Sequence, residues 1–221
     1  MRFLGWTPPG GSEELVVRLG PAGARARLLV LPAWFDEANK TRHFTVELMR
    51  ELAALGVGSD LPDLPGCNES LAPLEDQSLA TWRGAAASAA SQLGATHVLA
   101  IRAAVAIAPA LPGWAYAPVV GKTVLRGLLR ARVLTSREAG RIETSDGLLA
   151  LGRSEGLTLA GYRLGAGLVS DLADHSDAAA TLTEIAQAAL GGPGLWLRAE
   201  PDHDAAQAKA LAALIAQDVG Q

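Results

Sequence analysis

Cysteine is almost absent from this chain, since Cys67 is the only one among 221 residues. A single cysteine excludes an internal disulfide bond and any zinc site built from several cysteines. Long apolar runs are missing too. No stretch of about 18 consecutive apolar residues occurs, so the sequence predicts no membrane-spanning helix. The N-terminal residues also lack the apolar core of a signal peptide, and we therefore expect a cytoplasmic protein.

An excess of positive charge is missing as well. The formal net charge of −4 disfavours nucleic acid as the main partner. No histidine and acidic residues stand at a metal-ligand spacing such as His-Glu-x-x-His, so we expect no metal site, and nothing in the sequence indicates a cofactor. Hydrophobic residues are plentiful at 49%, against 19% charged residues, which is typical of a folded globular chain.

Strand and helix patterns alternate along the first half of the chain. Short apolar runs predict strands, and four-residue apolar periodicity predicts helices between them. The strands are expected at 15–19, 27–31 and 98–101, and the helices at 41–55 and 79–93. Gly20, Pro21 and Gly23 predict a hairpin or tight connection between the first two strands. Asn39 or Thr41 is expected to cap the first helix. The order predicts an α/β fold with a mostly parallel sheet, helices on both faces and right-handed crossovers.

The second half is less regular. We expect strands at 114–120, 157–162 and 195–197, and helices at 122–133, 164–172, 177–190 and 205–216. A polar, weakly patterned stretch at 137–153 predicts a loop-rich excursion or lid. Because no linker or repeat interrupts the chain, we expect residues 1–221 to form a single domain with a lid or loop excursion at about 134–156.

One strand and the turn after it organise the rest. The run from Val98 to Ile101 is short and bounded, as a strand buried on both faces is. Small residues follow Arg102 and suit a helix packed close against a sheet. In α/β-hydrolases such a strand-turn-helix is the nucleophile elbow, Gly-x-Ser-x-Gly. Here positions 100–104 read Ala-Ile-Arg-Ala-Ala, so an arginine stands where the nucleophile belongs.

Three stretches in order resemble the α/β-hydrolase superfamily. Pro32-Ala33-Trp34-Phe35 follows a strand where that fold places its oxyanion loop. Residues 61–70, Leu-Pro-Asp-Leu-Pro-Gly-Cys-Asn-Glu-Ser, are similar to the turn written A-P-D-L-P-G-H-G-x-S. Asn68 replaces a glycine there, and asparagine accepts a positive φ better than most residues. The third stretch is the altered elbow. The resemblance implies an α/β-hydrolase-like fold.

Shorter stretches resemble one subgroup, the exosortase A system-associated hydrolases of the second type. They are Phe35–Arg42, Asp63–Cys67, Ile101–Ala103, Pro118–Lys122 and Leu159–Tyr162. These are α/β-hydrolase-like proteins encoded beside bacterial exopolysaccharide and protein-sorting genes. Their elbow also resembles Gly-Leu-Arg-x-Gly, which makes Arg102 a trait of the group. The resemblance covers roughly 28–162. The chain is shorter than the family pattern at its end, where the last strand normally delivers the catalytic histidine.

Arg102 stays protonated at any working pH and cannot act as a serine-like nucleophile. One interpretation is a salt bridge with Glu37 or Asp36 on the oxyanion loop. The other is a clamp for a carboxylate, a phosphate or an anionic sugar, near helix N-terminal amides that prefer anions. On the resemblance we assign Phe35, Glu37, Asn39 and Arg102 to the pocket.

Three further residues are catalytic candidates. His203 and Asp204 follow the predicted late strand, where a triad histidine or acid emerges in this fold. The alternative is a solvated turn in which Asp204 caps the next helix. Cys67 lies in a turn near the pocket rim. Its alternative is a plain packed cysteine whose pKa is raised by Asp63 and Glu69.

Lys122, Arg126 and Arg130 form a basic stripe at four-residue spacing. It predicts a solvated helix face, or a surface for an acidic partner or an anionic lipid surface. Two functions stay open: a hydrolase of esters or related acyl bonds, and a non-catalytic module that binds an anionic ligand or partner through Arg102. They are distinguished by whether a serine or cysteine side chain lies within hydrogen-bond reach of a histidine.

Overall fold

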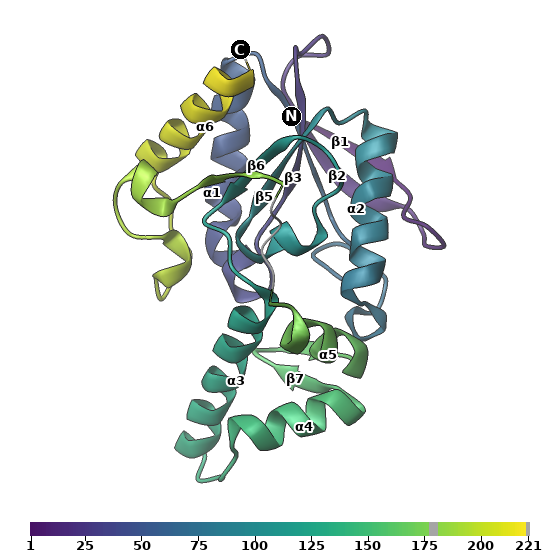
Figure 1. Cartoon of the computed structure of the whole chain (residues 1–221), viewed down its shortest axis with the longest axis vertical. Helices are drawn as coiled ribbons and strands as arrows, with labels where there is room; N and C mark the ends of the chain where they lie inside the picture. The colour runs from purple at the N-terminus through teal and green to yellow at the C-terminus, as the bar shows by residue number, and fades with distance from the viewer. Residues whose placement is uncertain (177–180, 220–221) are drawn as a thin grey trace.

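A central sheet organises the computed structural model, which describes residues 1–176 and 181–219 (Figure 1). Seven strands of this described part pair in the order β1 (Arg2–Trp6), β2 (Glu14–Leu19), β4 (Gly58–Pro62), β3 (Arg27–Leu31), β5 (His97–Ile101), β6 (Gly113–Tyr116) and β9 (Thr183–Ile185). From β4 to β9 the pairs are parallel, whereas β1, β2 and β4 pair antiparallel. The sheet is therefore mostly parallel, as the sequence predicts.

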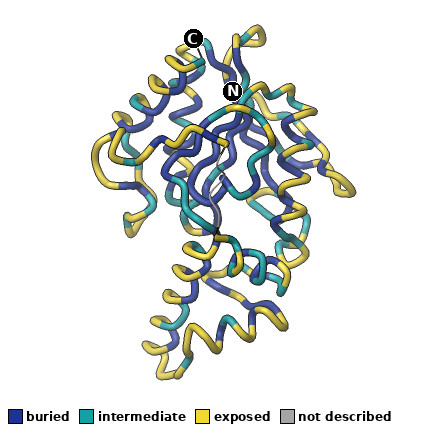
Figure 2. The backbone as a smooth tube through the Cα atoms, in the orientation of Figure 1, coloured by how far each residue is buried: buried dark blue, intermediate teal, exposed yellow. Residues whose placement is uncertain are grey.

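Helices cover both faces of this sheet. Helix α1 (Asp36–Ala54) packs with α6 (Ala205–Val219) on one face, and α2 (Leu79–Leu93) lies on the other (Figure 1). Successive residues of β3 point to opposite faces, so Leu28 joins the α1–α6 core and Leu29 joins the α2 core. Figure 2 shows the buried strands between these layers. The predicted fold class, an α/β fold with a mostly parallel sheet and helices on both faces, is confirmed.

Helix α2 has the bounds that the sequence predicts, and helix α1 ends within one residue of its predicted end. Helix α2 begins after Ser78, whose side chain accepts a hydrogen bond from the Thr81 amide at 3.0 Å, and it ends at Gly94 in the left-handed conformation. Helix α1 starts earlier than its periodicity indicates. Phe35 precedes it without a side-chain cap, so the prediction that Asn39 or Thr41 caps this helix is wrong.

A helical unit extends beyond the carboxyl ends of the strands (Figure 1). It contains α3 (Gly121–Glu138), α4 (Ser145–Glu155), the hairpin of β7 (Leu157–Leu159) and β8 (Tyr162–Leu164), and α5 (Ala166–Asp174). The loop-rich prediction for 137–153 is therefore wrong in its secondary structure. Arg132 donates to both carboxylate oxygens of Glu143, at 2.8 and 3.0 Å, and this pair ties α3 to the start of α4.

Four predictions of local structure are wrong. β4 lies between β2 and β3, so of the hairpin or tight connection predicted between these two strands the hairpin is wrong, and β1 is the hairpin partner that sequence reasoning missed. The predicted helix at 177–190 falls partly outside the described residues. Its described part holds β9 and a 3-10 helix, η3 (Gln187–Leu190). The predicted late strand is another 3-10 helix, η4 (Leu195–Leu197), and only a 3-10 helix, η2 (Arg102–Ile107), follows the elbow.

Candidate functional site

Backbone strain collects where the parallel strands end. Phe35, Asn68, Arg102 and Ala117 follow β3, β4, β5 and β6, and each has a positive φ, between 46° and 58°. A positive φ is uncommon for residues other than glycine and costs about 1–3 kcal/mol where the surrounding structure imposes it. Ligands of open α/β sheets bind outside these carboxyl ends. The strained loops therefore mark the edge at which we look for a site.

The turn after β5 is sharp and carries an arginine. Arg102 directly follows the buried strand β5 and has a φ of 58°. Ala100, Ala103 and Ala104 around it are fully buried, as close backbone packing at a sharp turn requires. The arginine itself is buried, with 8% of its surface exposed. The sharp turn at the end of β5 thus carries a buried guanidinium.

Arg102 is held by three neighbours. Its Nε and Nη2 donate to the two carboxylate oxygens of Glu37 at 3.0 and 3.1 Å, and its Nη1 donates to the Ala117 carbonyl at 2.7 Å. The guanidinium carbon lies 3.9 Å from the centre of the Trp196 ring, a cation–π contact. The predicted ion pair with Glu37 is confirmed, whereas Asp36 pairs with Lys40. The Glu37 carboxylate therefore already accepts the two parallel N–H bonds with which Arg102 would bind an anionic ligand.

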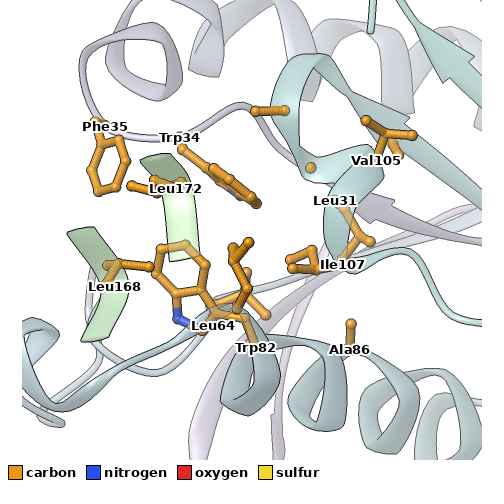
Figure 3. Packing of buried hydrophobic residues seen from close by; sticks show 14 of the residues in the cluster. Leu31, Trp34, Phe35, Leu64, Trp82, Ala86, Val105, Ile107, Leu168 and Leu172 are labelled. Atoms are coloured by element: carbon orange, nitrogen blue, oxygen red, sulfur yellow. The ribbon is translucent and has the colours of Figure 1, made fainter. Parts of the chain in front are cut away.

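An aromatic cavity of about 220 Å³ lies beside this pair, between the loops after β3 and β4. Phe35 and Asn39, two of the predicted pocket residues, are part of its wall. The aromatic wall consists of Trp34, Phe35, Trp82 and Tyr162, and Figure 3 shows the first three converging above Leu64. The Asn39 amide donates to the Tyr162 hydroxyl oxygen at 2.9 Å. The cavity is thus mostly apolar, with a small polar group at one side, as ligand pockets usually are.

A second cavity, of about 360 Å³, lies between the start of α1 and the length of α3. Trp34 and Phe35 form a wall shared by both cavities, and Glu37 and Trp196 belong to the second one only. Among the described residues, Arg102 lines neither of these two cavities. Arg102, which the sequence analysis assigns to the pocket, instead contacts Glu37 and Trp196, and these two residues line the second cavity.

Cys67 lines the first cavity but is not an activated thiol. Burial, together with repulsion from the carboxylates of Asp63 and Glu14, raises the pKa of the Cys67 thiol to about 12. Because the thiolate is the nucleophilic form, a thiol with this pKa is inert at neutral pH. The predicted effect of Asp63 is confirmed, and Glu14 takes the place that was expected for Glu69.

Two carboxyl groups near Cys67 are buried, which sequence reasoning did not predict. Asp63 accepts hydrogen bonds from the Asn68 amide at 2.7 Å and the Glu69 backbone at 3.4 Å, and Glu14 accepts one from the Ser70 hydroxyl at 2.8 Å. Burial raises the pKa of both carboxyl groups. The position of Asp63 in the Leu-Pro-Asp-Leu-Pro-Gly turn was a usable signal, but nothing local marks Glu14 as buried.

The catalytic candidates at the end of the chain lie in a helix cap. Asp204 Oδ1 accepts hydrogen bonds from the backbone of Ala206 and Gln207 at 3.0 and 3.1 Å, so the alternative that Asp204 caps α6 is confirmed. The His203 ring stacks on His43 of α1 with 4.2 Å between ring centres. Neither residue lines the two cavities described above.

Apart from His175, no described histidine is hydrogen-bonded to a serine or a cysteine. The Thr96 hydroxyl lies 2.8 Å from His97 Nδ1, but both residues stand at the amino end of β5, opposite the cavities. His175 Nδ1 accepts a hydrogen bond from the Gly121 amide at 2.9 Å. Leaving His175 aside, no described histidine is therefore placed as a general base beside a serine or cysteine, which acyl transfer needs.

Groups of three or more potential metal ligands are likewise absent from residues 1–176 and 181–219. Across those same residues, the helices fall short of the length and apolar character needed to cross a bilayer.

No protein-family model matches the chain, and no curated protein matches it in sequence. Solved structures of hydrolase-fold proteins are similar in part. They include a proline iminopeptidase from Mycobacterium smegmatis (17% identity, TM-score 0.45) and a proline iminopeptidase-related protein from Thermus thermophilus (20%, 0.48), each matched over 70% of this chain. A presumed hydrolase from Agrobacterium vitis (13%, 0.48) is matched over 84% of this chain and 89% of its own.

The chain spans 61% and 57% of the two iminopeptidase-type chains. The likeness concerns part of the backbone arrangement only, and the activities in those names belong to those proteins.

Proposed function

We propose that this chain is a non-catalytic binding protein of α/β-hydrolase-like fold, whose ligand is a small molecule held in the aromatic cavity. The observation that carries the proposal is the elbow itself. Arg102 occupies the position of the nucleophile, and Glu37 neutralises its charge through two hydrogen bonds. A guanidinium cannot attack an acyl carbon, and Cys67, the nearest alternative, is protonated.

The chemistry of the cavity wall supports a mostly apolar ligand with one polar group. The Tyr162 hydroxyl accepts from Asn39, and no described residue accepts its hydrogen, which leaves a donor for a ligand. The indole nitrogen of Trp34 is buried and has no acceptor among the described residues. A buried donor without a partner costs about 1–3 kcal/mol, so an acceptor group near this wall would bind favourably.

An anionic ligand would reach Arg102 only by displacing Glu37. We therefore assign Arg102 a positioning role, in which it fixes the start of α1 and thereby Phe35 and Asn39 on the cavity wall. The resemblance to exosortase A system-associated hydrolases supports a place for this protein in a bacterial exosortase or exopolysaccharide system, and we include that setting in the proposal.

A serine- and cysteine-reactive fluorophosphonate probe tests the non-catalytic part. We expect no stoichiometric labelling of the folded protein, as measured by intact mass. Labelling of one residue, located by peptide mass spectrometry, would show a working nucleophile outside the elbow. The hydrolase function would then replace the binding function.

Indole and indole-3-carboxylate test the ligand. The two compounds share the indole ring and differ by one carboxylate. Because a bound ligand raises the melting temperature, comparing the two shifts shows whether the site prefers a neutral or an anionic ligand. We expect both to stabilise the protein and to quench tryptophan fluorescence. Ala38→Leu, which fills the first cavity, should abolish the effect, whereas Ala131→Leu, on the wall of the second cavity, should not. Binding of the carboxylate alone would favour an anion clamp, and an unchanged response in Ala38→Leu would place the ligand elsewhere.

A further inference from the structure

Helices α3 and α4 form a hairpin that projects away from the sheet (Figure 1). Two aliphatic side chains stand out at its end. Ile142, in the connection between the helices, is 97% exposed, and Leu134, near the end of α3, is 59% exposed. Figure 2 shows this end of the molecule mostly exposed. Exposing aliphatic surface to water raises the free energy, so these two side chains at one projecting end would gain from contact with an apolar phase.

The same hairpin is positively charged within a negative chain. Residues 121–155 carry seven basic and four acidic side chains, whereas the remaining residues carry twelve basic and nineteen acidic ones. Arg132 and Arg153 are paired with Glu143 and Asp174. The other five basic side chains are exposed and form no salt bridge with a described residue: Lys122, Arg126, Arg130, Arg137 and Arg141.

These cations lead to the aliphatic end. Lys122, Arg126, Arg130 and Leu134 follow at four-residue spacing along α3, which places them in one stripe on the helix surface. Arg141 precedes Ile142 directly, and Arg137 lies between the two aliphatic residues in sequence. The stripe and the aliphatic end, defined as these seven residues, are called the hairpin surface below.

We propose that the hairpin surface docks reversibly on an anionic lipid bilayer. Leu134 and Ile142 would enter the boundary between headgroups and acyl chains, while the arginines contact lipid phosphates. Projecting aliphatic side chains flanked by cations are the pattern of interfacial binding. An acidic protein partner would be expected to use a groove that receives its side chains, and here the aliphatic groups stand at a projecting end. Each cation near an anionic surface is worth about a five-fold increase in partitioning.

Co-sedimentation with vesicles tests the proposal. The vesicles contain phosphatidylcholine either alone or with about one third phosphatidylserine, a composition with a negative surface potential. We expect binding to the anionic vesicles only, and a steep loss of binding as salt is added, because ions screen surface charge. Absence of binding to anionic vesicles at low salt would overturn the proposal.

Matched variants identify the surface. Arg126→Gln with Arg130→Gln should lower partitioning about 25-fold, by two five-fold steps. Arg2→Gln with Lys209→Gln removes the same charge from exposed positions outside the hairpin. This control should change partitioning onto the vesicles less than two-fold. Ile142→Ser should weaken binding at least five-fold with no change in charge. An equal loss in both double variants, or no effect of Ile142→Ser, would contradict this surface.

Two further measurements decide between occupants. Poly-glutamate serves as the probe for an acidic polypeptide, and sedimentation velocity without lipid detects self-association. Tighter binding of poly-glutamate than of anionic vesicles, or an Ile142-dependent dimer that binds no vesicles, would overturn the lipid proposal in favour of a protein partner or a second copy of this chain. Melting curves of all variants should match that of the unaltered protein, since every substituted side chain is exposed.

Discussion

The Arg102–Glu37 pair shows how hydrogen bonds and a cation–π contact offset the cost of burying a charge. Removing a guanidinium from water carries a large desolvation penalty, which is offset here by a bidentate carboxylate, a carbonyl oxygen and the face of Trp196. The side chains of Arg102 and Glu37 are only 10% and 22% exposed. Most of the cost of disturbing the pair therefore comes from the partner that is left behind.

A double-mutant cycle should show this dependence. We expect Arg102→Met and Glu37→Gln each to destabilise the fold by about 3 kcal/mol, the lower end of the cost of breaking a buried pair. The double variant should lose much less than the sum, with a coupling of about 1–3 kcal/mol in urea unfolding. The control is Lys40→Met with Asp36→Asn, a more exposed pair on the same helix, whose coupling should stay below about 1 kcal/mol. If the losses in the free energy of unfolding at positions 102 and 37 were additive, the two side chains would not stabilise each other.

Glu14 gives a second prediction at this scale, one that depends on pH. Burial raises the pKa of its carboxyl group in the folded state, so the folded state holds this proton more tightly than the unfolded chain does. The resulting cost to stability is fully present above the raised pKa and disappears below the ordinary pKa of about 4.3. Glu14→Gln keeps an acceptor for Ser70, and should therefore raise the free energy of unfolding at pH 7.

The measurement compares urea unfolding at pH 7 and near pH 4, where the gain of Glu14→Gln should shrink towards zero. Glu13→Gln is the control, because its side chain is exposed. A gain that is equal at both pH values would mean that desolvation of the charge is not the cause.

Some residues of the site were predictable and others were not. Asn68 has a φ of 50°, as its place in a glycine position of the turn motif indicated, and Arg102 bonds Glu37 as charge complementarity at the elbow indicated. The aromatic wall could not be derived. It forms because the β7–β8 hairpin brings Tyr162 against Asn39, 123 residues earlier in the chain, and no local pattern encodes that contact.

At the scale of elements, the register of β5 and β6 depends on one glycine. Gly113 pairs with Val98 and has a φ of 154°, and a Cβ at this position would lie 1.9 Å from the Val98 carbonyl oxygen. We expect Gly113→Ala to destabilise the fold by about 3 kcal/mol or more, through strain and overlap. Gly127, in α3, has open space around it, so Gly127→Ala should stabilise by up to about 1 kcal/mol. Similar effects of both substitutions in chemical unfolding would contradict this account.

Elements were predictable where local signals agreed. Helix α2 combines a Ser78 cap, an Ala-rich sequence and a closing Gly94, and its observed bounds are the predicted ones. The predicted helix at 177–190 missed β9, whose β-branched Thr183 and Ile185 favour a strand and which pairs with Trp114, Ala115 and Tyr116 of β6. β1 was missed because apolar and polar residues do not alternate in its sequence, Arg-Phe-Leu-Gly-Trp.

For the whole molecule, α6 closes one face of the sheet although it is far from β3 in sequence. Leu211 and Ile215 are fully buried in the core that α6 shares with α1, and the Trp114 indole of β6 donates to Asp218 at 2.8 Å. This half of the hydrophobic core therefore depends on the docking of α6.

Substitutions in α6 test that dependence. Leu211→Ala should cost about 2–5 kcal/mol, the range for large-to-small changes in a core. Leu214→Ala removes the same atoms from a side chain that is 38% exposed, and should cost less than about 1 kcal/mol. Equal midpoints for the two variants in denaturant unfolding would show that α6 is not part of the cooperative core.

The Arg102–Glu37 pair also governs how such a chain can change over generations. Substituting serine at 102 leaves the Glu37 carboxylate without its cation, and substituting Glu37 first leaves the guanidinium unpaired. Whichever residue changes first, the single variant loses a large part of the free energy of unfolding that a domain usually has. A serine at position 102 is therefore reached without a large loss of stability only when both positions change together, or after other substitutions have raised the stability of the fold.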